Sequence, residues 1–257
     1  MATKPQHDSN QSFITPDWHV PENIRAVSTC RRGGFSKAPY DSFNMGLHVG
    51  DSDCAVTANR ALLASHFQLS ATDIVWLNQI HSAEVIDVSY CRNYAGAVTA
   101  DGAFSADVRR PCVVMTADCL SVLLTDKDGQ RVASLHAGWR GLYAGVLTQG
   151  VAKFPDPKKV IAWLGPAIGP SAFEVGQDVF DAFTSQHRMH QSAFVATVNE
   201  SKWLADIYLL ARQKLNQLGV SEIFGGNRCT YSETASFFSY RRDGVTGRMA
   251  TMIWRQE

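Results

Sequence analysis

Apolar and polar residues follow two different periods along the chain, which predicts interleaved strands and helices. Short apolar runs bounded by Gly, Pro, Asn or Asp predict strands over residues 24–29, 74–77, 84–88, 112–116, 121–125, 131–136, 160–164 and 251–254. Apolar residues spaced three or four apart predict helices over residues 55–67, 142–154, 177–184 and 203–218. The segment 126–129 predicts a hairpin turn between two of the strands.

No repeat, low-complexity segment or Pro/Ser-rich linker interrupts this pattern. The polar residues 1–15 predict a disordered tail, and residues 16–257 predict a single domain. The predicted fold class is α+β, with mixed β-sheets covered by helices.

Composition excludes several classes of function. The chain has 257 residues, 45% hydrophobic and 19% charged, which is ordinary for a globular enzyme. Lys plus Arg equals Asp plus Glu, so no net positive charge attracts a nucleic acid or an anionic membrane. Six cysteines without a CxxC pair indicate reduced thiols, and residues 1–18 lack the apolar stretch of a signal peptide. We therefore expect a cytoplasmic protein without a membrane or nucleic-acid partner.

Three metal-capable side chains lie at strand ends or in turns beside strands: His81, Cys119 and His136. Two imidazoles and one thiolate make an incomplete tetrahedral set, which is what a catalytic zinc ion needs. No two of the three are close enough in sequence to form a local zinc knuckle, so the fold must bring them together. Such positions are preferred for sites in mixed α/β proteins, which favours one shared site.

Each of these residues also has an ordinary structural interpretation. Cys119 follows Asp118, whose carboxylate would raise a thiol pKa, and most free cysteines are buried structural residues. A bound metal would reverse that effect, because a coordinating thiol is deprotonated. His136 fits a core position before a tight turn as well as a ligand position beside a helix N-terminus, where Arg140 adds an anion contact. His81 in a polar turn is by itself typical of an exposed histidine.

A series of ordered motifs covers nearly the whole chain. They are residues 31–36, 44–51 with 59–60, 78–81, 100–102, 116–119, 136–141, 165–170 with 173–176, and 229–230 followed by 237–243 and 246–248. Together they resemble the YfiH family, whose members have been called laccase-domain or polyphenol oxidase proteins and later purine nucleoside phosphorylases. The departures are Cys30, Met45 and Phe173, where Thr, Leu and Tyr are more usual, and none is a proposed ligand.

The resemblance implies that His81, Cys119 and His136 are the metal ligands, with Zn²⁺ as the metal and Cu²⁺ as an alternative. It implies an α/β/β/α-type layered fold, related to the catalytic domain of cytotoxic necrotising toxins. It also implies phosphorolysis of adenosine, inosine, guanosine and 5′-methylthioadenosine, with adenosine deamination as a second activity. The partners are then purine nucleosides and inorganic phosphate, and we expect a monomer or a homodimer.

Phosphate needs cationic groups at the same site. The candidates are Arg31, Arg60, Arg140 and Arg241, and Arg31 is favoured because its motif places it beside a Gly-Gly turn. Asp118 is expected to orient a metal ligand or to carry a proton. His48, which lies between glycines, is a weaker candidate for the site.

The purine nucleoside needs aromatic and polar groups. Phe238 is a candidate for stacking on the purine, with Ser239 or Arg241 at the purine edge. Core phenylalanines in a strand are the more frequent explanation of such a segment. Glu174 is a candidate for binding the ribose hydroxyls, and it equally fits a helix cap.

Other functions stay open on the sequence. A cysteine hydrolase or amidase would use Cys119 as the nucleophile and His136 or His81 as the base. A role in peptidoglycan editing, linked to some family members, would place amide or aminoacyl substrates in the same pocket. A copper-dependent polyphenol oxidase is a further alternative, but the eight histidines include no His-x-His pair that would suit a trinuclear centre. A pure binding module fits least.

Overall fold

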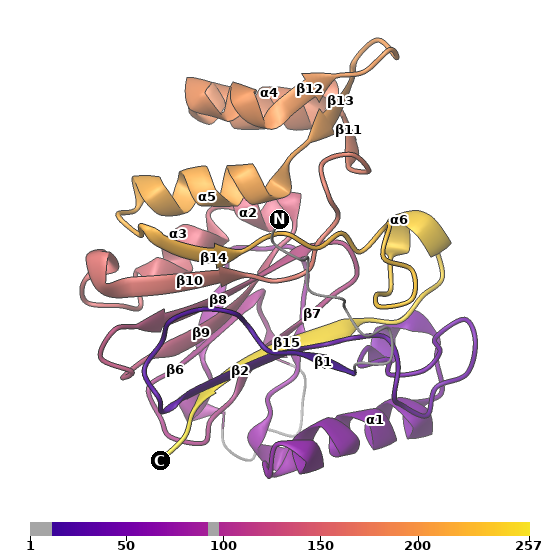
Figure 1. Ribbon diagram of the computed structural model, residues 1–257, viewed down its shortest axis with the longest axis vertical. Helices are drawn as coiled ribbons and strands as arrows, with labels where there is room; N and C mark the ends of the chain where they lie inside the picture. Colours follow the sequence, from indigo (N-terminus) through magenta and orange to yellow (C-terminus); the bar gives the residue numbers. More distant parts are fainter. Residues whose placement is uncertain (1–11, 92–97) are drawn as a thin grey trace, which may run out of the picture.

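The computed structural model describes residues 12–91 and 98–257, and its centre is two β-sheets packed face to face (Figure 1). The larger sheet has the strand order β14-β10-β8-β9-β6-β4 and the smaller one β1-β2-β15-β7. The larger sheet consists of β4 (Val85–Asp87), β6 (Gly102–Ser105), β8 (Leu120–Asp126), β9 (Val132–Ala137), β10 (Val160–Leu164) and β14 (Glu222–Gly225). The smaller sheet consists of β1 (Phe13–Ile14), β2 (Ile24–Thr29), β7 (Cys112–Thr116) and β15 (Met249–Arg255).

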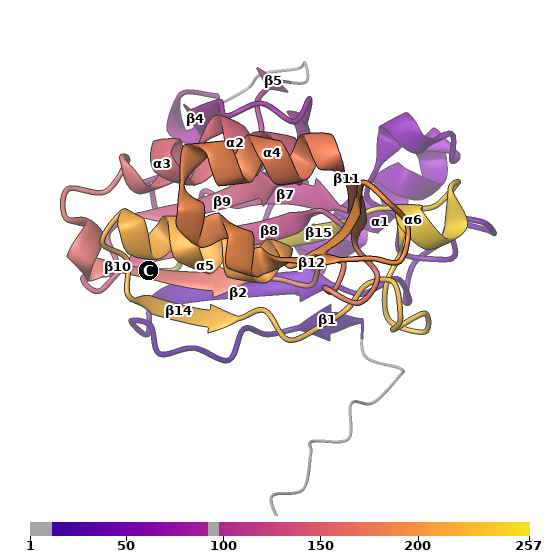
Figure 2. The same ribbon diagram turned by 90° about the horizontal axis from the view of Figure 1, so that it is seen from above.

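Helices cover the outer faces of both sheets (Figures 1 and 2). The smaller sheet packs against α1 (Asp53–His66). The larger sheet packs against α2 (Trp139–Ala144), α3 (Val146–Val151) and α5 (Ile207–Gln217), and α4 (Gln177–Gln186) lies farther from this sheet, against α2. The remaining elements are α6 (Tyr240–Asp243), the sheet of β11 (Glu174–Gly176), β13 (Lys202–Ala205) and β12 (Phe194–Ala196), and the pair β3 (Leu77–Asn78) and β5 (Val98–Thr99). Short 3₁₀ helices cover Leu47–Val49, Ala71–Asp73, Val88–Tyr90, Pro157–Lys159 and Arg188–Ala193.

Alternation of side chains along the strands of the two packed sheets produces the layers. In β7, Cys112 and Val114 point between the sheets, whereas Val113 and Met115 pack beneath α1. A strand buried on both faces has no polar side, so it is an unbroken apolar run in the sequence. The result is the α/β/β/α arrangement that the resemblance implied, in a single α+β domain, and this prediction is confirmed.

Two predicted helices differ from the structure. The helix predicted over residues 142–154 begins earlier, at Trp139, and is divided at Gly145, whose φ of +99° ends α2. The helix predicted over residues 203–218 is wrong in its first turn, because Lys202–Ala205 form β13. Asp206 then caps α5 by accepting a hydrogen bond from the Leu209 N–H at 2.9 Å.

The N-terminal segment and one strand also differ. Of the tail predicted over residues 1–15, residues 1–11 lie outside the described residues, but Phe13–Ile14 form β1, paired with β2. The strand predicted over residues 74–77 is reduced to Leu77–Asn78, because pairing occurs only with the two residues of β5. All six cysteines are free. Within the described residues, no helix has both the length and the apolar character needed to cross a membrane.

Candidate metal centre

The fold brings His81, Cys119 and His136 together at one end of the inner strands β8 and β9 of the larger sheet. Cys119 directly precedes β8, His136 lies near the end of β9, and His81 follows β3. β8 and β9 are antiparallel neighbours with Ser121 opposite His136, so their pairing places the thiol beside one imidazole. The three donor atoms lie within 4.8 Å of one another, and Cys119 Sγ is 3.8 Å from His81 Nε2.

A fully buried carboxylate, Asp101, holds both histidines. Its Oδ1 accepts hydrogen bonds from His136 Nδ1 at 2.8 Å and from the backbone N–H of His81 at 2.9 Å. Its Oδ2 accepts from the N–H and hydroxyl of Ser82 at 2.6 and 2.8 Å and from the Ile80 N–H at 3.2 Å. Burial alone would raise the pKa of Asp101, but the hydrogen bonds from His136 and Ser82 lower it to about 2. Because an ionised carboxylate only accepts, His136 carries a proton on Nδ1 and presents Nε2 to the site.

The electrostatics of the site favour a thiolate. Burial alone would raise the pKa of the Cys119 thiol, but the charge of His136 and hydrogen bonds from both imidazoles lower it to about 6. Burial alone would lower the pKa of His136, but the Cys119 thiolate and the Asp101 carboxylate raise it to about 9. Each charge stabilises the other. The thiolate is the form of cysteine that both metal binding and nucleophilic attack require.

Two neighbouring residues fix the position of the ligands. A Cβ atom at Gly138 would lie 2.9 Å from Cys119 Sγ and 3.0 Å from His81 Cδ2, so only glycine fits there without displacing them. Gln79 ties the His81 turn to β7, since its Nε2 donates to the Met115 carbonyl at 2.8 Å and its Oε1 accepts from the Met115 N–H at 2.7 Å. These contacts hold His81 at a φ of +63°, which is unusual for a non-glycine residue.

The three candidate ligands line a cavity of about 540 Å³, which is in the range of small-molecule sites. Its aromatic walls are Trp139, Phe173 and Tyr240. Four basic side chains also line it: His48, Arg140, Arg241 and Arg248. Among the lining residues only Asp118 is acidic, so the cavity favours anions.

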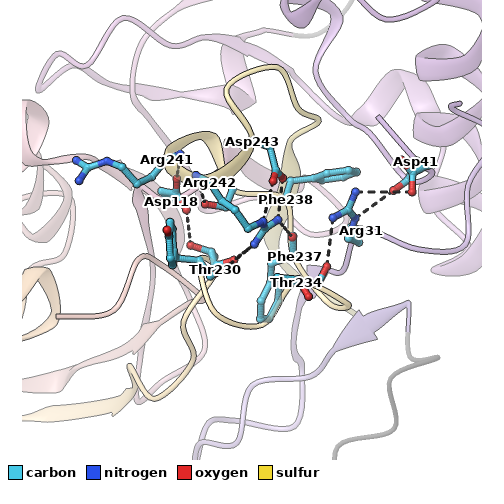
Figure 3. Close-up of polar contacts among 12 residues, drawn as sticks. Arg31, Asp41, Asp118, Thr230, Thr234, Phe237, Phe238, Arg241, Arg242 and Asp243 are labelled. Carbon is cyan, nitrogen blue, oxygen red and sulfur yellow. Dashed lines mark hydrogen bonds and ion pairs between the residues drawn. The ribbon is translucent and has the colours of Figure 1, made fainter. Parts of the chain in front are cut away.

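Asp118 lines the cavity, but its carboxylate is turned to the segment that carries α6 (Figure 3). Its Oδ1 accepts from the Thr230 hydroxyl at 2.6 Å, and its Oδ2 accepts from the Arg241 N–H at 2.7 Å. Both oxygens therefore hold residues 230–241 beside the candidate ligands. The contacts that orient His136 and His81 come from Asp101 and not from Asp118, and a proton-carrying role of Asp118 stays a prediction.

Two of the four predicted phosphate arginines, Arg140 and Arg241, line the cavity, and two do not. Arg31 lies outside it, where Nε and Nη1 donate to the carbonyls of Asp41 and Thr234, each at 3.2 Å (Figure 3). Arg60 donates through Nε and Nη2 to the Met45 carbonyl at 3.0 and 2.8 Å. Its guanidinium stacks 4.0 Å from the Trp76 ring. Both side chains therefore hold loops together.

Of the four predicted nucleoside-binding residues, Arg241 lines the cavity, whereas Phe238, Ser239 and Glu174 lie outside its lining. Phe238 is fully buried, so neither face of its ring is open to a purine, and the core interpretation applies. Ser239 caps α6 by accepting from the Arg242 N–H at 3.2 Å. Glu174 lies in β11, outside the helix, and its carbonyl accepts from Arg241 Nη1 at 2.9 Å.

Sequence reasoning assigned no role to Asp101, Tyr240 or Arg248, and it ranked His48 low. All four lie in the ordered motifs, at 100–102, 237–243, 246–248 and 44–51. Membership of a motif was thus the only available signal. It does not reveal which side chain of a motif points into a cavity.

Known proteins of several bacteria resemble this chain over nearly its whole length. A family model described as multi-copper polyphenol oxidoreductase laccase matches residues 25–256. A Haemophilus influenzae protein named purine nucleoside phosphorylase is 49% identical over 243 residues, which cover 94% of this chain and 98% of the relative. The Escherichia coli protein named purine nucleoside phosphorylase YfiH has the same identity and coverage. The crystal structure of a Neisseria meningitidis protein of family DUF152 matches with a TM-score of 0.91 at 45% identity, covering 96% of this chain and 100% of that one. The chain therefore belongs to the YfiH family, the family to which the laccase name has been attached.

Proposed function

We propose that the chain is a zinc-dependent purine nucleoside phosphorylase that acts on adenosine, inosine, guanosine and 5′-methylthioadenosine and also deaminates adenosine. The observation that carries the proposal is one cavity that joins three metal-capable side chains to aromatic and basic ones. Relatives named purine nucleoside phosphorylase, at 46% and 49% identity, support an enzyme of this kind. A cavity of about 540 Å³ has room for a nucleoside and a phosphate together.

The donor set fits zinc. Zn–S and Zn–N bonds of about 2.3 and 2.0 Å in a tetrahedron separate sulfur from nitrogen by roughly 3.5 Å. The separation of Cys119 Sγ from His81 Nε2, 3.8 Å, is close to that value. Three protein ligands leave one coordination position for a substrate or water, and Asp101 fixes His136 as a second-layer partner does in zinc enzymes. When bound, zinc supplies Lewis acidity to a substrate oxygen or to water, and copper would accept the same donors.

Phosphorolysis exchanges one bond at C1′ of the ribose. An oxygen of monohydrogen phosphate forms a bond to C1′, and the C1′–N9 bond breaks with its electron pair leaving on the purine. The proton lost by the phosphate balances the one gained by the purine. Deamination replaces the amino group at C6 with oxygen from water and releases ammonia.

The side chains that line the cavity have roles in both reactions. Basic groups attract phosphate and hold its oxygens. Tyr240 is 61% exposed and lines the cavity, so its ring offers a face on which a purine can stack. Asp118 keeps Tyr240 and Arg241 in place through the Arg241 N–H.

Product analysis tests the proposal. Protein of measured zinc content is incubated with adenosine, with and without phosphate, and the products are separated by liquid chromatography and identified by mass spectrometry. We expect adenine and ribose 1-phosphate only when phosphate is present, and inosine with ammonia in either case. A fully zinc-loaded protein that forms neither product would refute the proposal.

One observation favours a second candidate, a cysteine hydrolase or amidase. Cys119 is beside two imidazoles, its pKa is lowered to about 6, and His136 is held by a carboxylate, as in a Cys-His-Asp triad. Zinc content and alkylation separate the two candidates. A zinc enzyme should contain one ion per chain and resist iodoacetamide at Cys119 until a chelator removes the ion. A hydrolase should be alkylated and inactivated at Cys119 without a chelator.

The two remaining alternatives have less support. Among the described residues only one group of His, Cys, Asp and Glu side chains has metal-ligand geometry, and a trinuclear copper centre needs several more histidines. A peptidoglycan-editing role predicts altered muropeptides in a deletion strain, and an unchanged profile would exclude it. A cytoplasmic location and a monomeric or homodimeric state remain part of the proposal.

A further inference from the structure

The basic side chains of the cavity differ in how they are held. Arg140 is exposed and lies over the Trp139 ring at 4.3 Å. Arg241 is exposed, and its Nη1 donates to the Glu174 carbonyl. Arg248 is half-buried, so solvent screens its charge less than the charges of the other two. In the part of the chain that the structure describes, no carboxylate forms an ion pair with Arg248.

Arg248 is fixed at both its backbone and its guanidinium. Its N–H donates to Asn44 Oδ1 at 2.9 Å, and its carbonyl accepts from the Met45 N–H at 3.0 Å. Its Nη1 donates to the carbonyls of Thr246 and Gly247 at 2.9 and 3.0 Å. Among the described residues, Nε and Nη2 of Arg248 have no hydrogen-bond acceptor, although the side chain lines the cavity. A guanidinium that is held through one nitrogen, with two donors open on its other side, is preorganised to donate to two oxygens of an oxyanion.

His48 approaches the same point from the opposite loop. A Cβ atom at Gly46 would lie 2.9 Å from Arg248 Cγ and 3.4 Å from His48 Cε1, so both side chains flank this glycine. Partial burial of the imidazole, and then the charges of Arg248 and Arg60, lower the pKa of His48, although the residue as a whole is exposed. At neutral pH its imidazole is therefore uncharged and donates one N–H, and Arg248 supplies the positive charge.

We propose that Arg248 and His48 form a phosphate-binding subsite at the edge of the cavity, in which Arg248 Nε and Nη2 and one His48 nitrogen donate to phosphate oxygens. In naming inorganic phosphate as the ligand, this inference rests on the proposed function. The phosphate group has two possible sources, inorganic phosphate or the phosphate of a nucleoside 5′-monophosphate, and the shared chemistry is that of a tetrahedral dianion. The subsite replaces Arg31 and Arg60, which the sequence favoured and which hold loops instead.

Steady-state kinetics test the subsite in the zinc-loaded enzyme. Arg248→Met keeps the length of the side chain and removes its charge and donors, and His48→Ala removes an exposed side chain. We expect Arg248→Met to raise the KM for phosphate at least about tenfold, with the KM for adenosine unchanged within about twofold. Lys37→Met is the matched control, because Lys37 is an exposed cation outside the cavity lining, and it should change neither constant. The subsite would be overturned if each of the two variants, Arg248→Met and His48→Ala, raised the KM for phosphate and the KM for adenosine equally, or raised neither.

Calorimetric titration separates this inference from the proposed function. Orthophosphate, adenosine 5′-monophosphate and adenosine are each titrated into the wild type, Arg248→Met and His48→Ala. Loss of orthophosphate binding with retained adenosine binding supports the subsite, even if the wild type makes no ribose 1-phosphate. Loss of 5′-monophosphate binding alone supports the subsite and assigns it to a nucleotide. Unchanged binding of both phosphate compounds in both variants overturns it, whatever the products are. Among the described residues the His48 side chain has no hydrogen-bond partner, so His48→Ala keeps the test valid if Arg248→Met fails to fold.

Discussion

Replacing Asp101 by Asn tests whether one carboxylate organises the whole metal centre. The side chain is fully buried and accepts five hydrogen bonds, from Ile80, His81, Ser82 and His136. Folding lowers its pKa from 3.8 to about 2, so ionised Asp101 contributes about 2 kcal/mol to stability at neutral pH. Asn has the same shape but no charge, and its NH₂ group would face donors. We therefore expect the free energy of unfolding to fall by at least about 2 kcal/mol at pH 7.

The pH dependence of this loss has a definite sign. Because the folded pKa lies below the unfolded one, the contribution of Asp101 is complete above the unfolded value of 3.8 and is lost as the pH falls towards about 2. The difference between the wild type and Asp101→Asn should therefore narrow as the pH is lowered from about 5 to about 3. Urea denaturation of the zinc-free proteins, followed by tryptophan fluorescence, measures the difference at each pH.

Zinc affinity gives a second measure of the same carboxylate. Removing a partner that orients a ligand typically weakens metal binding 10- to 100-fold, and competition with a chromophoric chelator resolves such a change. Asp156→Asn is the matched control, because Asp156 is an exposed cap that accepts from the Lys158 N–H and Asn caps equally well. If Asp101→Asn bound zinc as tightly as the wild type and unfolded at the same urea concentration, the reasoning about Asp101 would be refuted.

Three further sets of substitutions probe the ligands and the cavity. We expect loss of stoichiometric zinc binding and of nucleoside turnover, with an unchanged circular dichroism spectrum, in each of Cys119→Ala, His81→Ala and His136→Ala. A Cys119→Ala variant that is active without zinc would refute the mechanism. Gly138→Ala should weaken zinc binding at least about tenfold, because the added carbon would lie 2.9 Å from Cys119 Sγ, and wild-type affinity would contradict that steric argument. Phe238→Ala should lower the free energy of unfolding by about 3–5 kcal/mol, whereas Tyr240→Ala should change it by less than about 0.5 kcal/mol and raise the KM for adenosine. The opposite pattern would return Phe238 to the purine site.

The apolar pattern located β7 and β10 because both strands are buried on both faces. Residues 112–116 and 160–164 were predicted with the bounds that β7 and β10 have in the structure. The pattern failed over residues 203–205, because what makes Lys202–Ala205 a strand is pairing with Glu174–Gly176 on one side and Phe194–Ala196 on the other. The partner Glu174–Gly176 lies far outside any local window of the sequence, and the hairpin with Phe194–Ala196 was not predicted.

The metal centre was predictable in its residue types and unpredictable in its support. Histidine and cysteine are the usual ligands of zinc, so their presence in turns and at strand ends predicted a metal site. Asp101 gave no such sign, because an aspartate before a glycine is typical of a turn. Its role comes from the pairing of β6 with β9, which sets Gly102 opposite Leu135 and so brings Asp101 to His136.

The arginines show most clearly what a sequence cannot contain. A guanidinium is available to a phosphate only when other acceptors leave some of its N–H groups open. Arg31 lies beside a Gly-Gly turn, as a phosphate ligand would, but it donates to the carbonyl of Thr234, 203 residues away in the chain. Arg248 lies beside no Gly-Gly turn, and its Nη1 donates to the carbonyls of the two residues before it. Among the described residues its Nε and Nη2 have no acceptor and can therefore donate to a ligand. Which arginine serves the site is therefore decided by long-range acceptors that compete for its donors, and only the folded chain determines them.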